Sequence, residues 1–369
     1  YFIMVTKHGA YIDGFAGPGE YTNFSEGSPI AALIVARAWL SKFGKTWAAG
    51  NLRFIFIDED KDRIEHLREL GDDVTVVSLT AGSDELPSLT NADFDSVIGD
   101  ELCFSELGPL FRDRSPGLRR VLLIHHLSAW EHPEGLERAR LLGLEKAAID
   151  AADACVATSL ATADRLRSER LVRDVFVAEP GADRLQRPAS AGQEPSGAHV
   201  RLLFIGNILP RKRVLELVNA FAGLPSAHAE LVLVGAELDP GYAAEVRLAI
   251  ASSEVAPRVR LMGCLEASQV MEQLAMADAL VLPSSLEGYG MVLSEALWSG
   301  VPVIAARVGA AEQLLSQSRA GLLFDPQDEA GLYSALSRFV SDPALRKRLR
   351  ESARSAQASL PRWRDTAQA

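Results

Sequence analysis

The feature that most constrains this chain is a regular alternation of apolar strands and amphipathic helices that begins at Val200. Residues 201–205 read as a buried strand, and apolar side chains at helical spacing follow between Val214 and Phe221. The pattern repeats in strands 230–235, 259–265, 279–283 and 301–306, with helices 242–251, 268–277, 294–298 and 311–316 between or after them. Such alternation implies parallel strands with right-handed crossovers, a doubly wound sheet that binds ligands beyond the carboxyl ends of its strands.

A second alternating block precedes a segment rich in Pro, Gly and Ser at 187–198, which reads as a linker. Its candidate strands are 11–15, 53–58, 74–79, 95–98, 121–125, 154–159 and 175–178. We therefore expect an α/β fold with two Rossmann-like, doubly wound domains. The predicted divisions are an N-terminal domain at 1–186, a linker at 187–199, a second domain at 200–342 and a helical tail at 343–369 that packs back toward the N-terminal domain.

Composition excludes several classes of function. Lys and Arg number 38 against 49 Asp and Glu, a net charge of −11, so we expect no nucleic-acid partner. The longest apolar runs, such as 30–36, are far shorter than the ~20 residues of a membrane span. Three well-separated cysteines and the lack of a signal sequence favour a reducing cytoplasm, and no cluster has the spacing of metal ligands.

The loop after strand 201–205 carries a basic run. Gly206 permits a tight turn, and Arg211, Lys212 and Arg213 stand where a helix would begin. Cations are unfavourable at helix N-termini, so this run requires an anionic partner, and a phosphate fits that requirement. The simpler alternative is a solvated basic surface.

The loop after strand 279–283 carries acids and glycines. Glu287 lies in the loop, Gly288 and Gly290 let backbone N–H groups approach a ligand, and Glu295 falls on the following helix. Two carboxylates could hold a polar ligand at two points at this edge of the sheet. Taken singly, each glutamate also fits a structural role as a cap or a surface acid.

Glu287 and Glu295 form an E-x7-E pattern within EGYGMVLSEA. This segment resembles the donor site of retaining glycosyltransferases of family 4, which have the GT-B fold, and GNILPRKR resembles the basic loop of the same family. ADALVLPSS, SGVPVIA, GAAEQLL, GLLFDPQD and the late Trp363 agree in order, so the resemblance covers about 73–369. It implies two Rossmann-like domains that face a cleft.

The resemblance also implies roles for single residues. Lys212 matches the lysine that contacts the donor diphosphate, Glu287 the glutamate beside the donor sugar, and Glu295 the glutamate that binds the ribose hydroxyls. The expected donor-binding set comprises Asn207, Arg211, Lys212, Gly288, Tyr289, Gly290, Met291, Val292 and Glu295. The family often has Arg at the position of Asn207, and Arg211 would supply that phosphate contact here.

The first domain resembles the same family from about residue 73. RVLLIHHLSAWE at 120–131 is similar to the strand and loop that carry an active-site histidine, and His125 takes the matching position, with His126 as the alternative. The implied role lies near the reacting sugar carbon or the acceptor. Local packing and turn hydrogen bonds would explain a His-His pair equally well without the family pattern.

Residues 1–70 depart from this family and are similar to the opening of three-Cys-motif partner proteins, which have a methyltransferase-like Rossmann domain. Asp13, Gly17 and Gly19 resemble an S-adenosylmethionine loop, and Asp58 resembles the acid that would hold ribose hydroxyls. Gly19 and Asp58 are 39 residues apart, more than the usual ~20.

We therefore predict a retaining glycosyltransferase, with Lys212, Glu287 and His125 as catalytic residues. Its partners would be a nucleotide-sugar donor and an unidentified carbohydrate, lipid or small-molecule acceptor. No metal or other cofactor is expected to be required, and the location would be cytoplasmic or peripheral to the inner face of a membrane. Two alternatives stay open: an S-adenosylmethionine-binding, methyltransferase-like module fused to a glycosyltransferase, and a non-catalytic nucleotide-binding partner.

Overall fold

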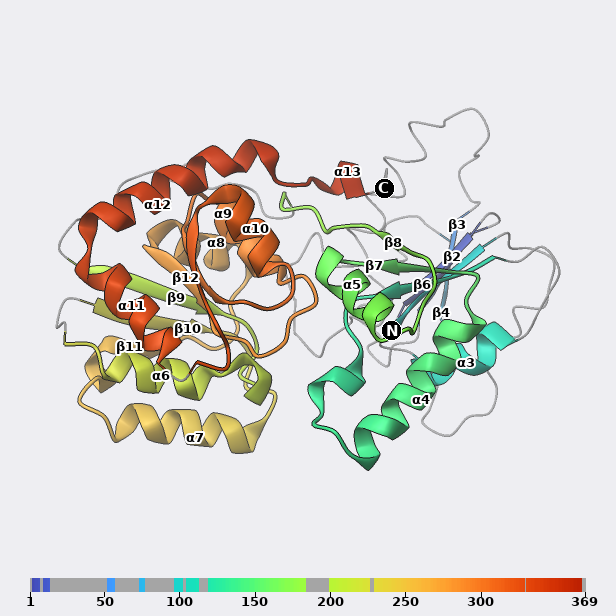
Figure 1. Cartoon of the computed structure of the whole chain (residues 1–369), viewed down its shortest axis with the longest axis horizontal. Helices are drawn as coiled ribbons and strands as arrows, with labels where there is room; N and C mark the ends of the chain where they lie inside the picture. The colour runs from blue at the N-terminus through green and yellow to red at the C-terminus, as the bar shows by residue number, and fades with distance from the viewer. Residues whose placement is uncertain are drawn as a thin grey trace. The chain divides into compact units, whose positions relative to one another are not determined.

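The chain forms two compact units, one that extends to Glu179 and one that spans Pro180–Thr366. The computed structural model (Figure 1) describes residues 2–6, 9–13, 52–56, 73–76, 96–101, 104–112, 119–183, 199–225, 229–328 and 330–366. The predicted linker at 187–199 falls almost wholly outside these residues. Each unit has its own sheet, and the predicted α/β class is confirmed.

The first unit contains an eight-stranded sheet in the order β4-β3-β1-β2-β5-β6-β7-β8. Five of its strands, β2 and β5 to β8, form one continuous parallel run, and β3 pairs in parallel with β4, as the strand and helix alternation predicts. The strands are β1 Phe2–Thr6, β2 Gly9–Asp13, β3 Leu52–Phe56, β4 Asp73–Val76, β5 Ser96–Asp100, β6 Arg119–Ile124, β7 Ala154–Ala157 and β8 Val175–Val177. The helices are α3 Phe104–Arg112, η2 Ser128–Glu131, α4 Leu136–Ala151 and α5 Leu160–Ser168.

Strand β1 is a departure from the predicted pattern. It was not among the expected strands, and it pairs antiparallel with both β2 and β3. Only two residues separate β1 from β2 in the sequence, which is enough for an antiparallel connection and far too few for a parallel crossover. The first sheet is therefore mixed, with one reversed strand among parallel pairs.

The second unit has a six-stranded, fully parallel sheet in the order β11-β10-β9-β12-β13-β14. The strands are β9 Val200–Ile205, β10 Ala229–Val234, β11 Val259–Leu261, β12 Ala279–Leu282, β13 Val303–Ala306 and β14 Gly321–Phe324. The chain runs outward from β9 in one direction, then returns to β12 and runs outward in the other. The switch point of this doubly wound sheet, where ligands bind in such folds, therefore lies between β9 and β12.

Helices cover both faces of the second sheet. Figure 1 shows α6 and α7 on one side and α8, α9 and α10 on the other. The helices are η3 Pro210–Lys212, α6 Val214–Ala222, α7 Pro240–Ala251, η4 Ala256–Arg258, α8 Ala267–Met276, α9 Met291–Trp298, α10 Ala311–Ser318, α11 Gly331–Ser341, α12 Pro343–Ala356, η5 Gln357–Ser359 and α13 Trp363–Thr366. Among the described residues, no helix is both long and apolar enough to cross a membrane.

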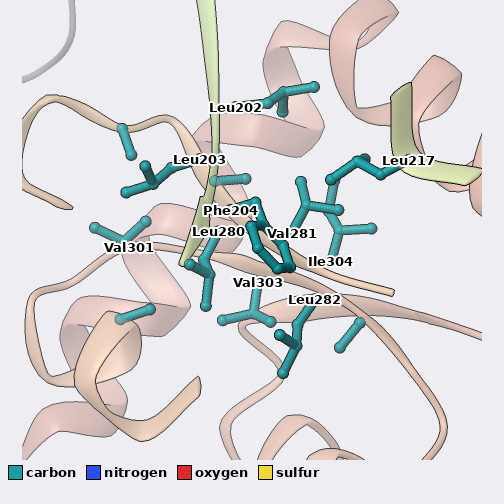
Figure 2. Close-up of a cluster of buried hydrophobic side chains, with 14 of the residues drawn as sticks. Leu202, Leu203, Phe204, Leu217, Leu280, Val281, Leu282, Val301, Val303 and Ile304 are labelled. Carbon is teal, nitrogen blue, oxygen red and sulfur yellow. The ribbon is translucent and has the colours of Figure 1, made fainter. Parts of the chain in front are cut away.

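The core of the second unit lies on the central strands. Phe204 of β9 is fully buried, and Figure 2 shows it among side chains of β12 and β13. The four residues of β12 and the four of β13 are all buried, as expected for strands covered on both faces. This continuous core belongs entirely to the second unit, so the loops at the switch point rest on a rigid base.

The ends of the second unit are joined. Helix α12 packs against α9, α10 and α11, and Arg362 lies over the ring of Trp298 on α9. The backbone N–H of Ala182 donates to the carbonyl of Pro361 at 2.8 Å, which links the start of this unit to its last turn. The described tail thus contacts the second unit, and its predicted packing toward the N-terminal domain stays a prediction.

Candidate active site

The loops that follow β9 and β10 touch through their backbones. The N–H of Gly206 donates to the carbonyl of Val234 at 2.9 Å. A Cβ atom at Gly235 would lie only 1.9 Å from the carbonyl oxygen of Gly206, so any other residue there would collide with the neighbouring loop. This contact fixes where the loop after β9 leaves the sheet, and that loop carries the predicted donor residues Asn207, Arg211 and Lys212.

The loop after β12 packs on the loop after β9 and on the loop after β13. The N–H of Ser285 donates to the carbonyl of Arg211 at 2.8 Å. At Gly309, which has a φ of 54°, a Cβ would lie 2.7 Å from the carbonyl oxygen of Glu287 and 2.8 Å from that of Gly288. Three loops therefore meet at the carboxyl edge of the sheet, around its switch point.

Lys212 and Glu287 join across this meeting point. The Lys212 Nζ donates to Glu287 Oε1 at 2.5 Å, and the two side chains are 13% and 8% exposed. An Arg211 nitrogen lies 4.0 Å from Glu287 Oε2 and donates to the carbonyl of Leu286 at 3.4 Å. The structure thus brings together the predicted residues Arg211, Lys212 and Glu287, although Glu287 lies 75 positions after Lys212 in the chain.

The electrostatics of Glu287 follow from this arrangement. Burial alone would raise the pKa of Glu287, but the charge of Lys212, its hydrogen bond and the charge of Arg211 together lower the pKa below the usual value. Glu287 is therefore ionised at neutral pH. Two cations share one carboxylate, so this group keeps a formal charge of +1.

The basic run is thus satisfied inside the protein. The anionic partner of Lys212 in the structure is the Glu287 carboxylate, while the expected phosphate stays a prediction. Arg213 pairs with Glu216 at 3.1 Å and donates to the carbonyl of Pro326 at 2.8 Å. Arg213 also adopts a left-handed backbone with a φ of 54° at the start of α6, without a side-chain cap. This run is therefore not a solvated basic surface.

Helix α9 begins at the same meeting point. Gly290, with a φ of 79°, is its N-cap residue, and no side chain caps the helix. Met291 and Val292 form its first turn and are half-buried, and Gly288 and Tyr289 just before it are buried. Glu295, on the same helix, is only 4% exposed. The N-cap of α9 lies three residues after Glu287, whose carboxylate pairs with Lys212, and an uncapped helix N-terminus favours an anion.

His125 belongs to a separate cluster in the first unit, at the carboxyl ends of β5 and β6. His125 Nε2 lies 2.9 Å from Asp100 Oδ2, and the His125 backbone N–H donates to Glu101 Oε2 at 2.7 Å. Asp100 and Glu101 are almost fully buried, while the His125 side chain is 30% exposed. The Asp100 carboxylate on Nε2 fixes the orientation of the imidazole.

His126, the alternative in the sequence, differs from His125. Its Nε2 lies 2.6 Å from Glu131 Oε1, and Glu131 is exposed. Its contact is a local pair within one loop, whereas His125 bridges two strands. The geometry therefore favours His125 as the functional histidine.

Sequence reasoning missed the acids around this histidine. Burial raises the pKa of Glu101 well above its usual value, although the charge of His125 opposes that effect. Glu145 on α4 is 1% exposed, and burial raises its pKa to about 7. The one available signal was that Asp100 and Glu101 closely follow the predicted strand 95–98, as His125 ends the predicted strand 121–125.

One group among the described residues has the composition and spacing of metal ligands. Single ligand atoms of Asp100, Glu101 and His125 lie within 4.8 Å of one another. Hydrogen bonds within the trio already account for this closeness, and the expectation of no metal stays a prediction. Of the predicted cofactor loop, Asp13 ends β2, whose Ile12 aligns with Gly99 of β5. Gly17, Gly19 and Asp58 lie outside the described residues.

Comparison with known proteins agrees with this geometry. Residues 191–356 match the family model described as "Glycosyl transferases group 1". A D-inositol 3-phosphate glycosyltransferase of Nocardioides sp. is 31% identical over 306 residues, 74% of this chain and 65% of that protein. A glycogen synthase of Mycobacterium tuberculosis is 27% identical over 53% of this chain and 47% of that protein. The chain thus spans less than two thirds of the length of these curated relatives.

Solved structures resemble the fold over nearly the whole chain. Anabaena HepE, in complex with UDP and glucose, has a TM-score of 0.74 at 17% identity and covers 98% of this chain and 97% of its own. Sucrose-phosphate synthase from Thermosynechococcus elongatus has a TM-score of 0.67 at 22% identity and covers 84% and 90%. The predicted fold of two Rossmann-like domains of the GT-B type is confirmed.

Proposed function

We propose that this chain is a retaining glycosyltransferase that moves a sugar from a nucleotide-diphosphate sugar to an acceptor hydroxyl. The observation that carries the proposal is the group formed by Arg211, Lys212 and Glu287 at the switch point of the second sheet. It places a net positive charge beside the N-terminus of α9, where ligands of such sheets bind. The family match over residues 191–356 covers all of these residues.

The proposed chemistry follows from the charge that the reaction creates. Cleavage of the bond between the sugar and the diphosphate leaves negative charge on the diphosphate. Lys212, fixed by Glu287, and Arg211 neutralise that charge more strongly in the transition state than in the ground state, which lowers the barrier. Because Lys212 is already ordered, little reorganisation is required when the donor binds.

The remaining predicted residues complete the site. Glu295 would accept hydrogen bonds from ribose hydroxyls, and backbone N–H groups of residues 288–292 would bind phosphate and sugar oxygens. Glu287 would orient the sugar as well as Lys212. His125, oriented by Asp100, would act on the acceptor side. The acceptor is an unidentified carbohydrate, lipid or small molecule.

The decisive experiment measures release of nucleoside diphosphate from a panel of nucleotide sugars. UDP-glucose is the first probe, since HepE was solved with UDP and glucose. We expect turnover by the wild type and a loss of about 100-fold or more in Lys212→Ala, the usual effect of removing a charge-stabilising group. Lys347→Ala, an exposed lysine on α12, is the matched control and should retain wild-type turnover. Stereochemistry of the product, read by NMR, tests retention.

Two results would contradict the proposal. The first is a wild-type protein that turns over no nucleotide sugar. If that protein still binds nucleotide, the non-catalytic alternative is favoured. The other is equal turnover in Lys212→Ala. Titration with S-adenosylmethionine tests the remaining alternative, and an absence of binding heat would remove it.

A further inference from the structure

The segment from His125 to Glu131, here called the histidine loop, is held by acids that lie outside it. Its first N–H, that of His125, donates to Glu101 Oε2 at 2.7 Å. Its Ser128 N–H donates to Glu145 Oε1 at 2.5 Å, and the Ala129 N–H lies 3.4 Å from the same oxygen. Glu101 follows β5 and Glu145 lies on α4, so acids from two separate elements accept hydrogen bonds from one loop.

We propose that Glu101 and Glu145 are positioning residues, which hold the histidine loop so that His125 meets the acceptor at a fixed place. This inference rests on the proposed function, since it assigns His125 to the acceptor side. Neither glutamate acts on substrate itself. Each acts through the backbone of the loop.

The burial of these acids is the first argument. Both are 1% exposed, and Glu145 lies on α4 among buried apolar residues such as Leu141, Ala148 and Ile149. A buried carboxylate is unfavourable unless its oxygens accept hydrogen bonds, and an apolar side chain would stabilise such a helix face better. A glutamate at this position therefore serves the loop whose N–H groups it accepts, rather than the packing of α4.

The distribution of the other contacts is the second argument. The carbonyl of His125 accepts a hydrogen bond from Thr162 Oγ1 at 2.9 Å, and the indole N–H of Trp130 donates to Glu169 at 3.0 Å. Arg165 lies 4.1 Å from the centre of the Trp130 ring. The carbonyl side and the far end of the loop are thus anchored by α5, and the glutamates anchor its N–H side.

The electrostatics agree with this role. Burial raises the pKa of Glu145, with a further rise from the charge of Glu131, while the N–H groups of Ala129 and Ser128 oppose it. Burial and Asp100 raise the pKa of Glu101, while His125 and the N–H groups of His125 and His126 oppose it. In both cases the loop's N–H groups favour the ionised acid, so acid and loop stabilise each other.

The test compares alanine and glutamine variants of each acid in the full chain. Alanine removes the acceptor, while glutamine keeps an oxygen that accepts the N–H bond. Hydrogen exchange of the segment 122–131 is measured together with nucleotide release from the donor, with water as acceptor. Glu137→Gln, on the exposed face of the same helix, is the matched control, because the Glu137 carboxylate accepts hydrogen bonds from Arg140 on its own helix.

We expect Glu145→Ala and Glu101→Ala to accelerate exchange at 125–131 by about 10- to 100-fold, the effect of losing one acceptor for a buried donor. The kcat should fall by a similar factor while the donor KM stays within about 2-fold, since the donor site lies in the other unit. The glutamine variants should recover a large part of both effects, and Glu137→Gln should match the wild type.

The inference is overturned if the alanine variants exchange like the wild type at 125–131, or if they keep a wild-type kcat. It is equally overturned if exchange rises evenly across the first unit and glutamine gives no recovery, because the acids would then serve general stability alone. A wild type without turnover contradicts the proposed function instead. Since exchange requires no substrate, that arm still decides whether the acids hold the loop.

Discussion

At the scale of single residues, the arrangement of Arg211, Lys212 and Glu287 makes an unusual prediction about binding and catalysis. Glu287→Gln removes the one negative charge, so the group changes from +1 to +2. We expect a nucleoside diphosphate to bind a few-fold more tightly at low salt, while turnover falls by about 10- to 100-fold because Lys212 loses its anchor. Calorimetric titration and initial rates measure the two effects. Binding and turnover that fall together would contradict this account.

The raised pKa of Glu145 predicts that the stability of the first unit depends on pH. Its pKa is about 7 in the folded chain against an ordinary 4.5, so the folded state binds the proton more tightly than the unfolded state. Stability of the first unit should therefore decrease as the pH rises from about 4.5 to 7, by at most ~3 kcal/mol. Glu145→Gln should remove this pH dependence, so the stability of the variant relative to the wild type should increase as the pH rises. Denaturant unfolding at several pH values measures the free energy of unfolding of both proteins. The same pH dependence in the variant and the wild type would refute the prediction.

Residue types differ in how well the sequence reveals them. Lys212 and Glu287 could be predicted because each follows a recognisable strand and lies in a family motif. Glu101 and Glu145 could not, because a glutamate in a helix or at a strand end is usually exposed. Their burial depends on which backbone N–H groups the fold brings near, and those donors come from a loop without a regular pattern.

At the scale of elements, the meeting of three loops depends on Gly309. Gly309→Ala would place a methyl group 2.7 Å from the carbonyl of Glu287 on a backbone with a φ of 54°. We expect a loss of ~2–4 kcal/mol in the stability of the second unit, with reduced turnover as the loop after β12 shifts. Gly143→Ala is the control, because nothing lies within 4 Å of that helical position, and it should stabilise α4 by ~0.5–1 kcal/mol. Equal melting of both variants would contradict the packing described.

The elements themselves were predictable where one pattern dominates. Five of the six strands of the second unit fall within or beside the predicted ranges because they are short apolar runs covered on both faces, whereas β14 was not among the expected strands. The predicted strand 259–265 ends early at Leu261, and Gly263 just beyond it has a left-handed backbone with a φ of 67°. Strand β1 was missed because its pairing is antiparallel and comes from a short local connection, which the alternation rule does not describe.

At the scale of the whole molecule, the continuous core and all the predicted donor residues lie in the second unit. We expect a fragment of residues 180–366 to fold alone and to bind a nucleoside diphosphate within about 3-fold of the full chain's affinity. The same fragment should transfer no sugar, because His125 and its supporting acids belong to the first unit. Circular dichroism, titration and a transfer assay check this. A fragment that folds but binds no nucleotide would place part of the donor site elsewhere.

The hydrogen bond between Ala182 and Pro361 brings the entry and exit points of the second unit together, which bears on how such proteins evolve. A module whose entry and exit points adjoin can be cut from one gene and spliced into another while its interior stays undisturbed. Recombination at these two adjoining points of the chain would let evolution exchange the first unit and so, on the proposed function, change which acceptor receives the sugar.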